Sequence, residues 1–161
     1  EEGRITLARE ETSLESLWNS VMADWKHACD IKELTCTYQA PNMPLSSLSV
    51  DADKIRLVFT KLMENAVSYT PNKGKVKAQM TQINGRIRFE ITDTGVGIPE
   101  VEQKRIFTRF YRASNASTMK PDASGLGLSI AKFFIEQHDG KIGFTSVEGK
   151  GSTFWFELPL A

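Results

Sequence analysis

The residues best placed to do chemistry lie in two glycine-containing motifs. The first, Asp93-Thr-Gly-Val-Gly-Ile-Pro99, follows an alternating apolar segment, Arg86–Thr92, that is typical of a β-strand. Two glycines directly after a strand allow the backbone to approach a flat ligand closely, because no Cβ intervenes. The Asp93 carboxylate can then accept a hydrogen bond from an amine of that ligand. The motif therefore indicates a site for a planar molecule that carries an amine.

The second motif, Gly125-Leu-Gly-Leu128, opens a predicted helix from Leu126 to Gln137. The first N–H groups of a helix lack intrahelical partners and favour anions, so a phosphate can be held there. Either motif alone is weak evidence, but their order and spacing, with Asn65 upstream, favour a nucleotide. Between residues 103 and 121 the chain also contains five cations and no acid, which suits a polyphosphate: Lys104, Arg105, Arg109, Arg112 and Lys120.

Length and composition restrict the class of protein. The chain has 161 residues, of which 40% are hydrophobic and 25% charged, with zero formal net charge, and this indicates one soluble domain. The charge balance argues against nucleic acid or an anionic membrane as the main partner. No apolar run approaches the roughly 18 residues that span a bilayer. Cys29 and Cys36 lack metal-ligand spacing and are expected to be free buried thiols in a reducing compartment.

Two helices are predicted in the first half of the chain. The first follows a capping box at Thr12–Glu15 and carries His27 on its solvated side, between strands expected at Arg4–Arg9 and Leu34–Gln39. Asp51 is expected to cap the second helix, whose core stripe is Ile55, Phe59, Leu62 and Ala66. Along the edge of that stripe lies one row from which side chains can enter a cleft: Lys61, Asn65 and Tyr69.

The second half contains the signals of a sheet and a lid. Asn84-Gly85 predicts a hairpin between strands 75–83 and 86–92, and the sheet is completed by strands 141–147 and 152–158. Pro99 is expected at the first position of a short helix that ends near Phe107. The segment Ala113–Ser124 is small, polar and aperiodic, so we expect a mobile lid between the glycine motifs.

These motifs, in this order, resemble the catalytic and ATP-binding domain of sensor histidine kinases, within the GHKL ATPase group. The likeness covers essentially the whole chain. Five segments are similar, in turn, to the N box, the first glycine box, the F box, the second glycine box and the closing strand of the family: Leu62–Pro71, Asp93–Gly97, Phe107–Phe110, Gly125–Leu128 and Gly149–Pro159.

The resemblance implies an α/β (α+β) two-layer sandwich. A mixed, largely antiparallel sheet of about five strands would be covered on one face by three helices, with ATP between the helices and the lid. Residues 1–161 would be the catalytic domain of a protein histidine kinase, which binds Mg²⁺-ATP and donates the γ-phosphate to a histidine on a partner dimerisation helix domain. A response regulator receiver domain would then accept the phosphoryl group.

The same resemblance bears on the whole protein. Neither His27 nor His138 lies in the family's acceptor motif, so we expect the dimerisation and phosphoacceptor domain upstream, in a longer chain. The fragment is expected to be a monomer and the full-length protein a homodimer. We expect a cytoplasmic location, either for the whole protein or for the cytoplasmic portion of a membrane-bound sensor.

The resemblance also assigns roles to single residues. Asn65 would coordinate Mg²⁺, Asp93 would accept from the adenine amino group, and Tyr69 would lie against the adenine ring. Arg112 and Arg109 would face the phosphates as the lid closes. Either Ser152 or Thr153 would complete a water network around adenine. Further nucleotide contacts are assigned to the two glycine boxes: Gly95, Gly97, Ile98, Gly125, Leu126, Gly127 and Leu128.

Two positions depart from the family pattern. Lys61 occupies a position where the family usually has Asn or Glu, and Ser68 one where it commonly has Lys. A cation beside a Mg²⁺ site would repel the metal, or it would contact a phosphate in place of the missing lysine; Lys61 is therefore a candidate catalytic residue. The departures keep two alternatives open: a catalytically weak module that senses ATP or docks a partner, and another GHKL kinase or ATPase. The Tyr69-Thr-Pro71 run favours the histidine kinase.

Overall fold

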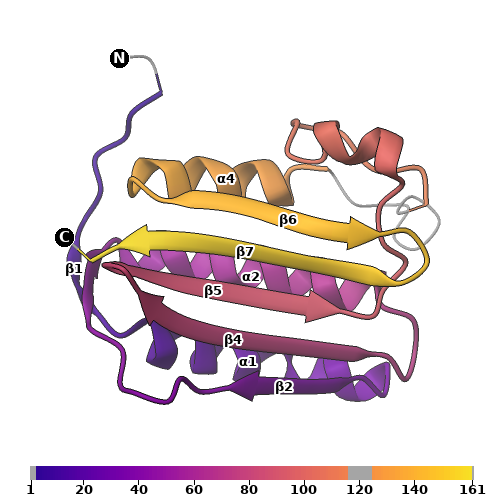
Figure 1. Cartoon of the computed structure of the whole chain (residues 1–161), viewed down its shortest axis with the longest axis horizontal. Helices are drawn as coiled ribbons and strands as arrows, with labels where there is room; N and C mark the ends of the chain where they lie inside the picture. The colour runs from indigo at the N-terminus through magenta and orange to yellow at the C-terminus, as the bar shows by residue number, and fades with distance from the viewer. Residues whose placement is uncertain (1–2, 116–124, 161) are drawn as a thin grey trace.

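A computed structural model describes residues 3–115 and 125–160 of the chain. Its main sheet has five strands in the order β2-β4-β5-β7-β6 (Figure 1). β2 runs parallel to β4, and the other neighbouring pairs are antiparallel. The bounds are Thr35–Gln39 for β2, Lys75–Ile83 for β4, Arg86–Asp93 for β5, Gly151–Pro159 for β7 and Lys141–Val147 for β6.

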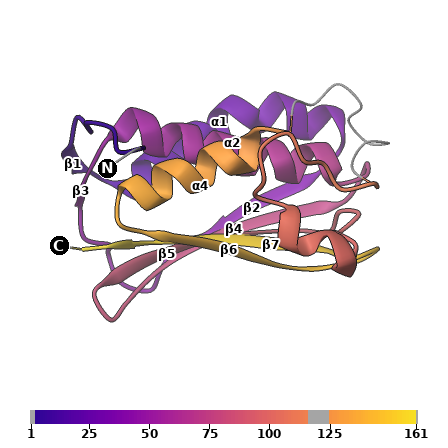
Figure 2. The same ribbon diagram turned by 90° about the horizontal axis from the view of Figure 1, so that it is seen from above.

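Three helices of the described residues lie on one face of this sheet (Figure 2). They are α1 (Leu14–Ile31), α2 (Ala52–Tyr69) and α4 (Gly127–Gln137). A short 3-10 helix, η1 (Glu100–Arg105), lies between the first glycine motif and the predicted lid. The predicted two-layer sandwich, with a mixed and largely antiparallel sheet, is confirmed.

An aromatic cluster joins the two layers. Trp18 of α1 contacts Phe59 of α2 and Phe89 of β5. Phe59 and Phe89 contact each other and Phe156 of β7, and all these ring centroids are 4.7–5.5 Å apart. All four side chains are fully buried, and Phe89 and Phe156 are directly opposite each other in the sheet. Burial of such large rings stabilises the packing of α2 on the sheet, and α2 is the helix that carries Asn65 and Tyr69.

Most predicted elements occur where the local signals placed them. The β4–β5 hairpin turns at Asn84 and Gly85, both with positive φ, and Asp51 caps α2 by accepting a hydrogen bond from the Lys54 N–H. Cys29 and Cys36 are both free, with their sulfurs 2.7 Å apart. No helix among the described residues is long and apolar enough to cross a membrane.

The predicted strand at Arg4–Arg9 is wrong. The strand β1 is instead Glu10–Thr12, which pairs with a strand the sequence did not reveal, β3 (Leu48–Val50), in a separate two-stranded sheet. In the predicted strand segment, backbone N–H groups form hydrogen bonds with side chains rather than with a neighbouring strand. The Ile5 N–H donates to the Gln137 side chain, and the Ala8 N–H donates to Asp51.

The ends of two helices also differ from the prediction. Ser13, one residue after the predicted capping position, is the N-cap of α1 and accepts from the Ser16 N–H, because Thr12 belongs to β1. Pro99 is the N-cap of η1 rather than its first residue, and η1 ends at Arg105, short of Phe107.

Candidate functional site

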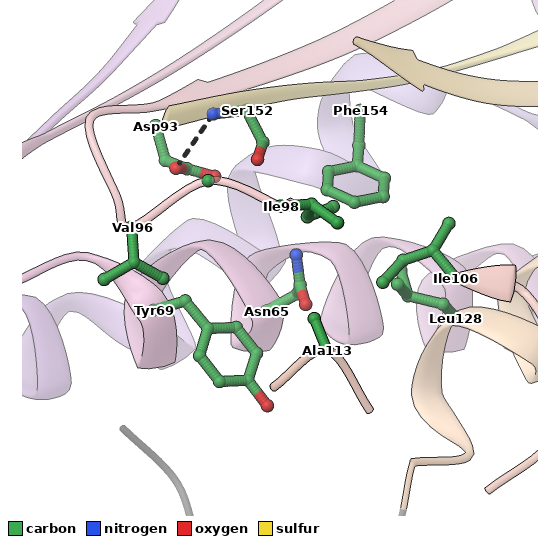
Figure 3. A pocket seen from close by; sticks show the side chains of 11 residues that line it. Asn65, Tyr69, Asp93, Val96, Ile98, Ile106, Ala113, Leu128, Ser152 and Phe154 are labelled. Carbon is green, nitrogen blue, oxygen red and sulfur yellow. Dashed lines mark hydrogen bonds between the residues drawn. The ribbon is translucent and has the colours of Figure 1, made fainter. Parts of the chain in front are cut away.

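A pocket lies between α2 and the sheet, at the end of β5 (Figure 3). It encloses about 380 Å³ of empty space, open solvent included. Asn65 and Tyr69 enter it from α2, and Asp93, Ser152 and Phe154 enter it from the sheet (Figure 3). The other lining residues come from the glycine loop, η1, the start of the lid and α4: Val96, Gly97, Ile98, Ile106, Ala113 and Leu128.

The structure brings six of the predicted site residues together around this pocket: Asn65, Tyr69, Asp93, Gly97, Ile98 and Leu128. Two of the three residues in the predicted row along α2, Asn65 and Tyr69, therefore reach a cleft, and Lys61 does not. Eight others do not line the pocket: Lys61, Gly95, Arg109, Arg112, Gly125, Leu126, Gly127 and Thr153.

Asp93, the last residue of β5, is the buried charge of the pocket. It is 6% exposed, and its Oδ1 accepts hydrogen bonds from the Gly95 N–H at 2.8 Å and the Ser152 N–H at 3.3 Å. Burial raises the pKa of this carboxyl to about 6, and the two N–H donors oppose that rise because they stabilise the charged form. Asp93 is thus held rigidly, and it is mainly ionised at neutral pH.

The structure corrects the role predicted for Thr153. Ser152 lines the pocket, and its hydroxyl lies 2.8 Å from that of Ser146. Successive residues of a strand point to opposite faces, so Thr153 points away and its hydroxyl lies 2.9 Å from that of Thr92. Of the two residues predicted to complete a network beside adenine, only Ser152 faces the pocket.

The four glycines of the motifs serve different purposes. An added Cβ at Gly95 would lie 2.5 Å from the Tyr69 carbonyl oxygen, so the glycine loop rests directly on the end of α2. Gly97 and Gly125 both have positive φ, and an added Cβ would collide with the backbone of Val147 or Phe110. Close approach of protein backbone to protein backbone therefore requires glycine at these three positions.

Gly127 behaves differently. Among the described residues, a Cβ added there would have only the Lys61 side chain near it, at an ordinary contact distance of 3.6 Å. The Lys61 ammonium is 3.9 Å from the Glu64 carboxylate, and both side chains are about one-third exposed. Lys61 thus lies beside the first turn of α4, outside the pocket found between α2 and the sheet.

The base of the predicted lid is anchored to the glycine motifs. The Phe110 N–H donates to the Gly125 carbonyl at 3.0 Å, and the Asn115 side chain donates to the Gly97 carbonyl at 2.9 Å. Arg109 is exposed and Arg112 is half-buried. Residues 116–124, which include Lys120 and most of the predicted lid, lie outside the described residues.

Sequence reasoning missed the apolar walls of the pocket. Val96, Ile106 and Phe154 line it beside the polar residues. Phe154 could have been found, because it lies two residues after Ser152 on the same face of β7. Ile106 could not, because its place depends on how the 3-10 segment folds back over the glycine loop.

Comparison with known proteins places this site in a family. Residues 50–161 match the family described as histidine kinase-, DNA gyrase B-, and HSP90-like ATPase. The chain belongs to this ATPase family. The resemblance inferred from the motifs is confirmed.

Curated relatives of this ATPase domain are named sensor kinases. The chain is 35% identical over 151 residues to the adaptive-response sensory kinase SasA of a Synechococcus strain, covering 93% of this chain and 39% of SasA. It is 35% identical over 136 residues to the sensor protein kinase WalK of Staphylococcus epidermidis, covering 83% of this chain and 22% of WalK. The chain thus spans well under half of these relatives.

Solved structures of histidine kinases share the fold of this ATPase domain. The catalytic domain of ThkA superposes with a TM-score of 0.84 at 24% identity, covering 96% of this chain and 97% of that one. Full-length ShkA in complex with AMPPNP superposes with a TM-score of 0.84 at 29% identity, covering 98% of this chain and 32% of that one. ThkA in complex with the response regulator protein TrrA superposes with a TM-score of 0.79 at 24% identity, covering 95% of this chain and 42% of that one.

Proposed function

We propose that this domain binds Mg²⁺-ATP and donates its γ-phosphate to a histidine on a partner dimerisation helix domain. The observation that carries the proposal is the pocket itself, in which the buried Asp93 carboxylate faces Asn65 and Tyr69 of α2. Family membership supports ATP as the ligand, since ShkA, one of the similar structures, is a complex with AMPPNP.

The adenine would bind at the Asp93 end of the pocket. Both described hydrogen bonds of Asp93 end on Oδ1, so we assign Oδ2 to the exocyclic amine of adenine. Tyr69 would lie against the ring, and Ile98 and Phe154 would exclude water from it. A charged acceptor and apolar walls select a flat base that carries an amine donor.

The phosphates would extend toward the first turn of α4. The N-terminus of a helix favours anions, and Gly127 leaves its backbone open to approach. Lys61 beside that turn would contact a phosphate, as would Arg112 and Arg109 when the lid closes. Phosphoryl transfer needs mainly positioning and charge neutralisation, which these residues would supply.

The residues present fit a Mg²⁺ ion that is carried by the nucleotide. Within residues 3–115 and 125–160 there is no group of three His, Cys, Asp or Glu side chains that could hold a metal. Mg²⁺ commonly keeps water and takes few protein ligands beside substrate phosphates. The Asn65 amide oxygen would be its protein ligand, and the bound ion would neutralise phosphate charge.

The partners of the reaction are also proposals, because the chain spans only part of its relatives. The acceptor histidine would lie in a dimerisation domain of the same protein, and a receiver domain would take the phosphoryl group. The sensor-kinase relatives and the complex of ThkA with the response regulator TrrA support this sequence of partners. The full-length protein would be a homodimer whose catalytic domain faces the cytoplasm.

One observation favours the alternative of a catalytically weak, ATP-sensing module. The Lys61 ammonium lies near Glu64, so an ion pair competes with any phosphate contact. A partly exposed pair of this kind is weak, and an ATP phosphate carries more charge than one carboxylate. The kinase therefore remains the better-supported function.

Mg²⁺-dependent transfer of labelled phosphate from ATP to a supplied acceptor-helix domain tests the proposal. The wild type should transfer phosphate, and Asn65→Ala should reduce the rate at least about a hundredfold, as for loss of a key electrostatic contact. An active Asn65→Ala variant would remove the assigned metal site. A wild type that binds ATP tightly but transfers nothing would favour the sensing module.

The role of Lys61 is tested in the same assay. If Lys61 contacts a phosphate, Lys61→Ala weakens ATP more than adenosine and slows transfer. If it repels Mg²⁺, Lys61→Asn raises activity instead. The matched control is Lys77→Ala, at an exposed position of β4, which should change neither quantity.

A further inference from the structure

The C-terminal end of α2 is fixed by donors from three different places in the chain. The last four carbonyl groups of a helix have no intrahelical partner, so they need hydrogen bonds from elsewhere. In α2 all four have one: Ala66 from the Thr70 hydroxyl at 2.6 Å, Val67 and Ser68 from the Lys32 ammonium at 2.8 and 3.4 Å, and Tyr69 from the Val96 N–H at 3.0 Å.

Lys32 supplies two of these four contacts from a distant part of the chain. It is the C-cap of α1, and its carbonyl accepts a hydrogen bond from the Lys73 N–H at 2.9 Å. Its backbone is therefore tied both to α1 and to the turn after α2. The side chain is half-buried, and burial lowers the pKa of its ammonium.

The position of this cation matters because of what the last turn of α2 carries. A cation at a helix C-terminus interacts favourably with the helix dipole as well as with the carbonyl oxygens. Tyr69 lies in that turn and lines the pocket, and Asn65 lies one turn earlier. The glycine loop rests on the same turn, since an added Cβ at Gly95 would lie 2.5 Å from the Tyr69 carbonyl oxygen.

We propose that Lys32 is a positioning residue of the nucleotide site. Through the Val67 and Ser68 carbonyl oxygens it holds the turn that presents Tyr69, and through that turn it holds the glycine loop that follows Asp93. Without the ammonium, the last turn of α2 loses two of these four hydrogen bonds and loosens against the loop. The inference rests on the proposed nucleotide function and adds to it a residue that lies outside every motif of the sequence.

The test is Lys32→Met, which keeps the apolar stem and removes the donor and the charge. We expect ADP affinity, measured by calorimetry on protein shown to be folded at that temperature, to fall about fivefold, consistent with a partly buried helix-end interaction. Lys32→Arg should restore most of the affinity. Lys26→Met is the control, since that lysine of α1 pairs only with the exposed Asp30 among the described residues.

Hydrogen exchange distinguishes a local positioning role of Lys32 from general destabilisation of the fold. In folded Lys32→Met the Val96 amide, which bonds the Tyr69 carbonyl, should exchange faster, while amides in the middle of α1 keep their protection. Lower thermal stability with unchanged ADP affinity and unchanged Val96 exchange would overturn the inference and leave Lys32 a purely structural residue.

Two further outcomes bear on the inference. If Lys32→Met does not fold, Lys32→Gln, which keeps an N–H donor without the charge, replaces it and should weaken ADP to a smaller extent; unchanged affinity in that variant would again overturn the inference. A wild type that does not bind ADP would instead overturn the proposed function. A difference between the variants and the wild type tests only the role of Lys32.

Discussion

The proposed adenine and phosphate ends of the nucleotide site differ in how firmly the protein holds their residues. At the adenine end Asp93 is buried and bonded to two backbone N–H groups, and Ser152 is bonded to Ser146. At the phosphate end Arg109 is exposed, and Phe110 is 72% exposed with a positive φ of 64°. One end is preorganised, whereas the other presents cations that still have to be brought to an anion.

This difference indicates a division of labour. A preformed acceptor in an apolar pocket gives affinity and selectivity for the base, because little ordering is needed when it binds. Exposed cations contribute little until a multiply charged ligand gathers them. Changes at the adenine end should therefore affect adenosine and ATP alike, and changes at the phosphate end should affect ATP alone.

The largest effect is expected from Gly97→Ala, which breaks the adenine end. The new Cβ would lie 2.2 Å from the Val147 carbonyl oxygen, and the φ of 68° at position 97 is strained for any residue with a side chain. The steric clash and the backbone strain therefore both destabilise the fold. We expect the free energy of unfolding, measured with urea, to fall by at least about 3 kcal/mol. Gly149→Ala, which has positive φ but open space, should cost only about 1 kcal/mol.

Gly127→Ala is the counterpart at the phosphate end. Within the part of the chain that the structure describes, no close contact opposes the new methyl group, so stability should change by less than about 1 kcal/mol. If the phosphates approach this backbone, ATP should bind more weakly while adenosine is unaffected. An equal loss for both ligands would contradict the division between the two ends.

Asp93→Asn is expected to have the next largest effect. The change keeps the size of the side chain but replaces a charged acceptor by one that can turn an amide donor toward the adenine amine. Adenosine and ATP should each lose about 1.5–3 kcal/mol of binding free energy in calorimetry, the range for a hydrogen bond to a charged group. Unchanged affinity would remove Asp93 from the adenine site.

A smaller effect is expected from pH, through the raised pKa of Asp93. Because the carboxylate binds the amine better than the neutral acid does, adenosine affinity should fall about five- to tenfold between pH 7 and pH 5. Adenosine is the probe because it has no phosphate to titrate. Asp93→Asn should show no such dependence.

The same group has the opposite effect on stability. The folded-state pKa, about 6, is above the ordinary value of 3.8, so the folded protein binds more protons than the unfolded chain between these values. The contribution of Asp93 to stability is therefore fully present below pH 3.8 and is lost as the pH rises through about 6. Urea titrations of wild type and Asp93→Asn across this range separate it from other groups.

The smallest effect is expected from Arg109→Ala. This exposed side chain should leave adenosine affinity unchanged and reduce ATP affinity by less than about 1 kcal/mol, with a larger loss at low salt. Lys104→Ala, at an exposed position of η1, is the control. A loss of several kcal/mol would mean that Arg109 is desolvated in the bound state, and the phosphate end would then be better ordered than the structure indicates.

Local sequence signals determined much of this protein. The period of the apolar residues placed Asn65 and Tyr69 on one edge of α2, and Asn84-Gly85 fixed the β4–β5 hairpin. The order of the motifs identified the family. Each of these features depends on neighbours within a few residues, or on the order of segments, so no knowledge of packing was needed.

Tertiary structure decided which side chains actually meet. Strand alternation separates Ser152 from Thr153, but only the packing of the helices on one face of the sheet shows which of them shares the pocket with α2 (Figure 2). The pairing of β1 with β3 and the position of Lys61 beside the start of α4 likewise bring distant segments together. Lys32 is the clearest case, because its partners lie 35 and 36 residues away, in carbonyl groups that every helix end leaves open. A sequence shows that such groups need donors, and only the folded chain selects the donor.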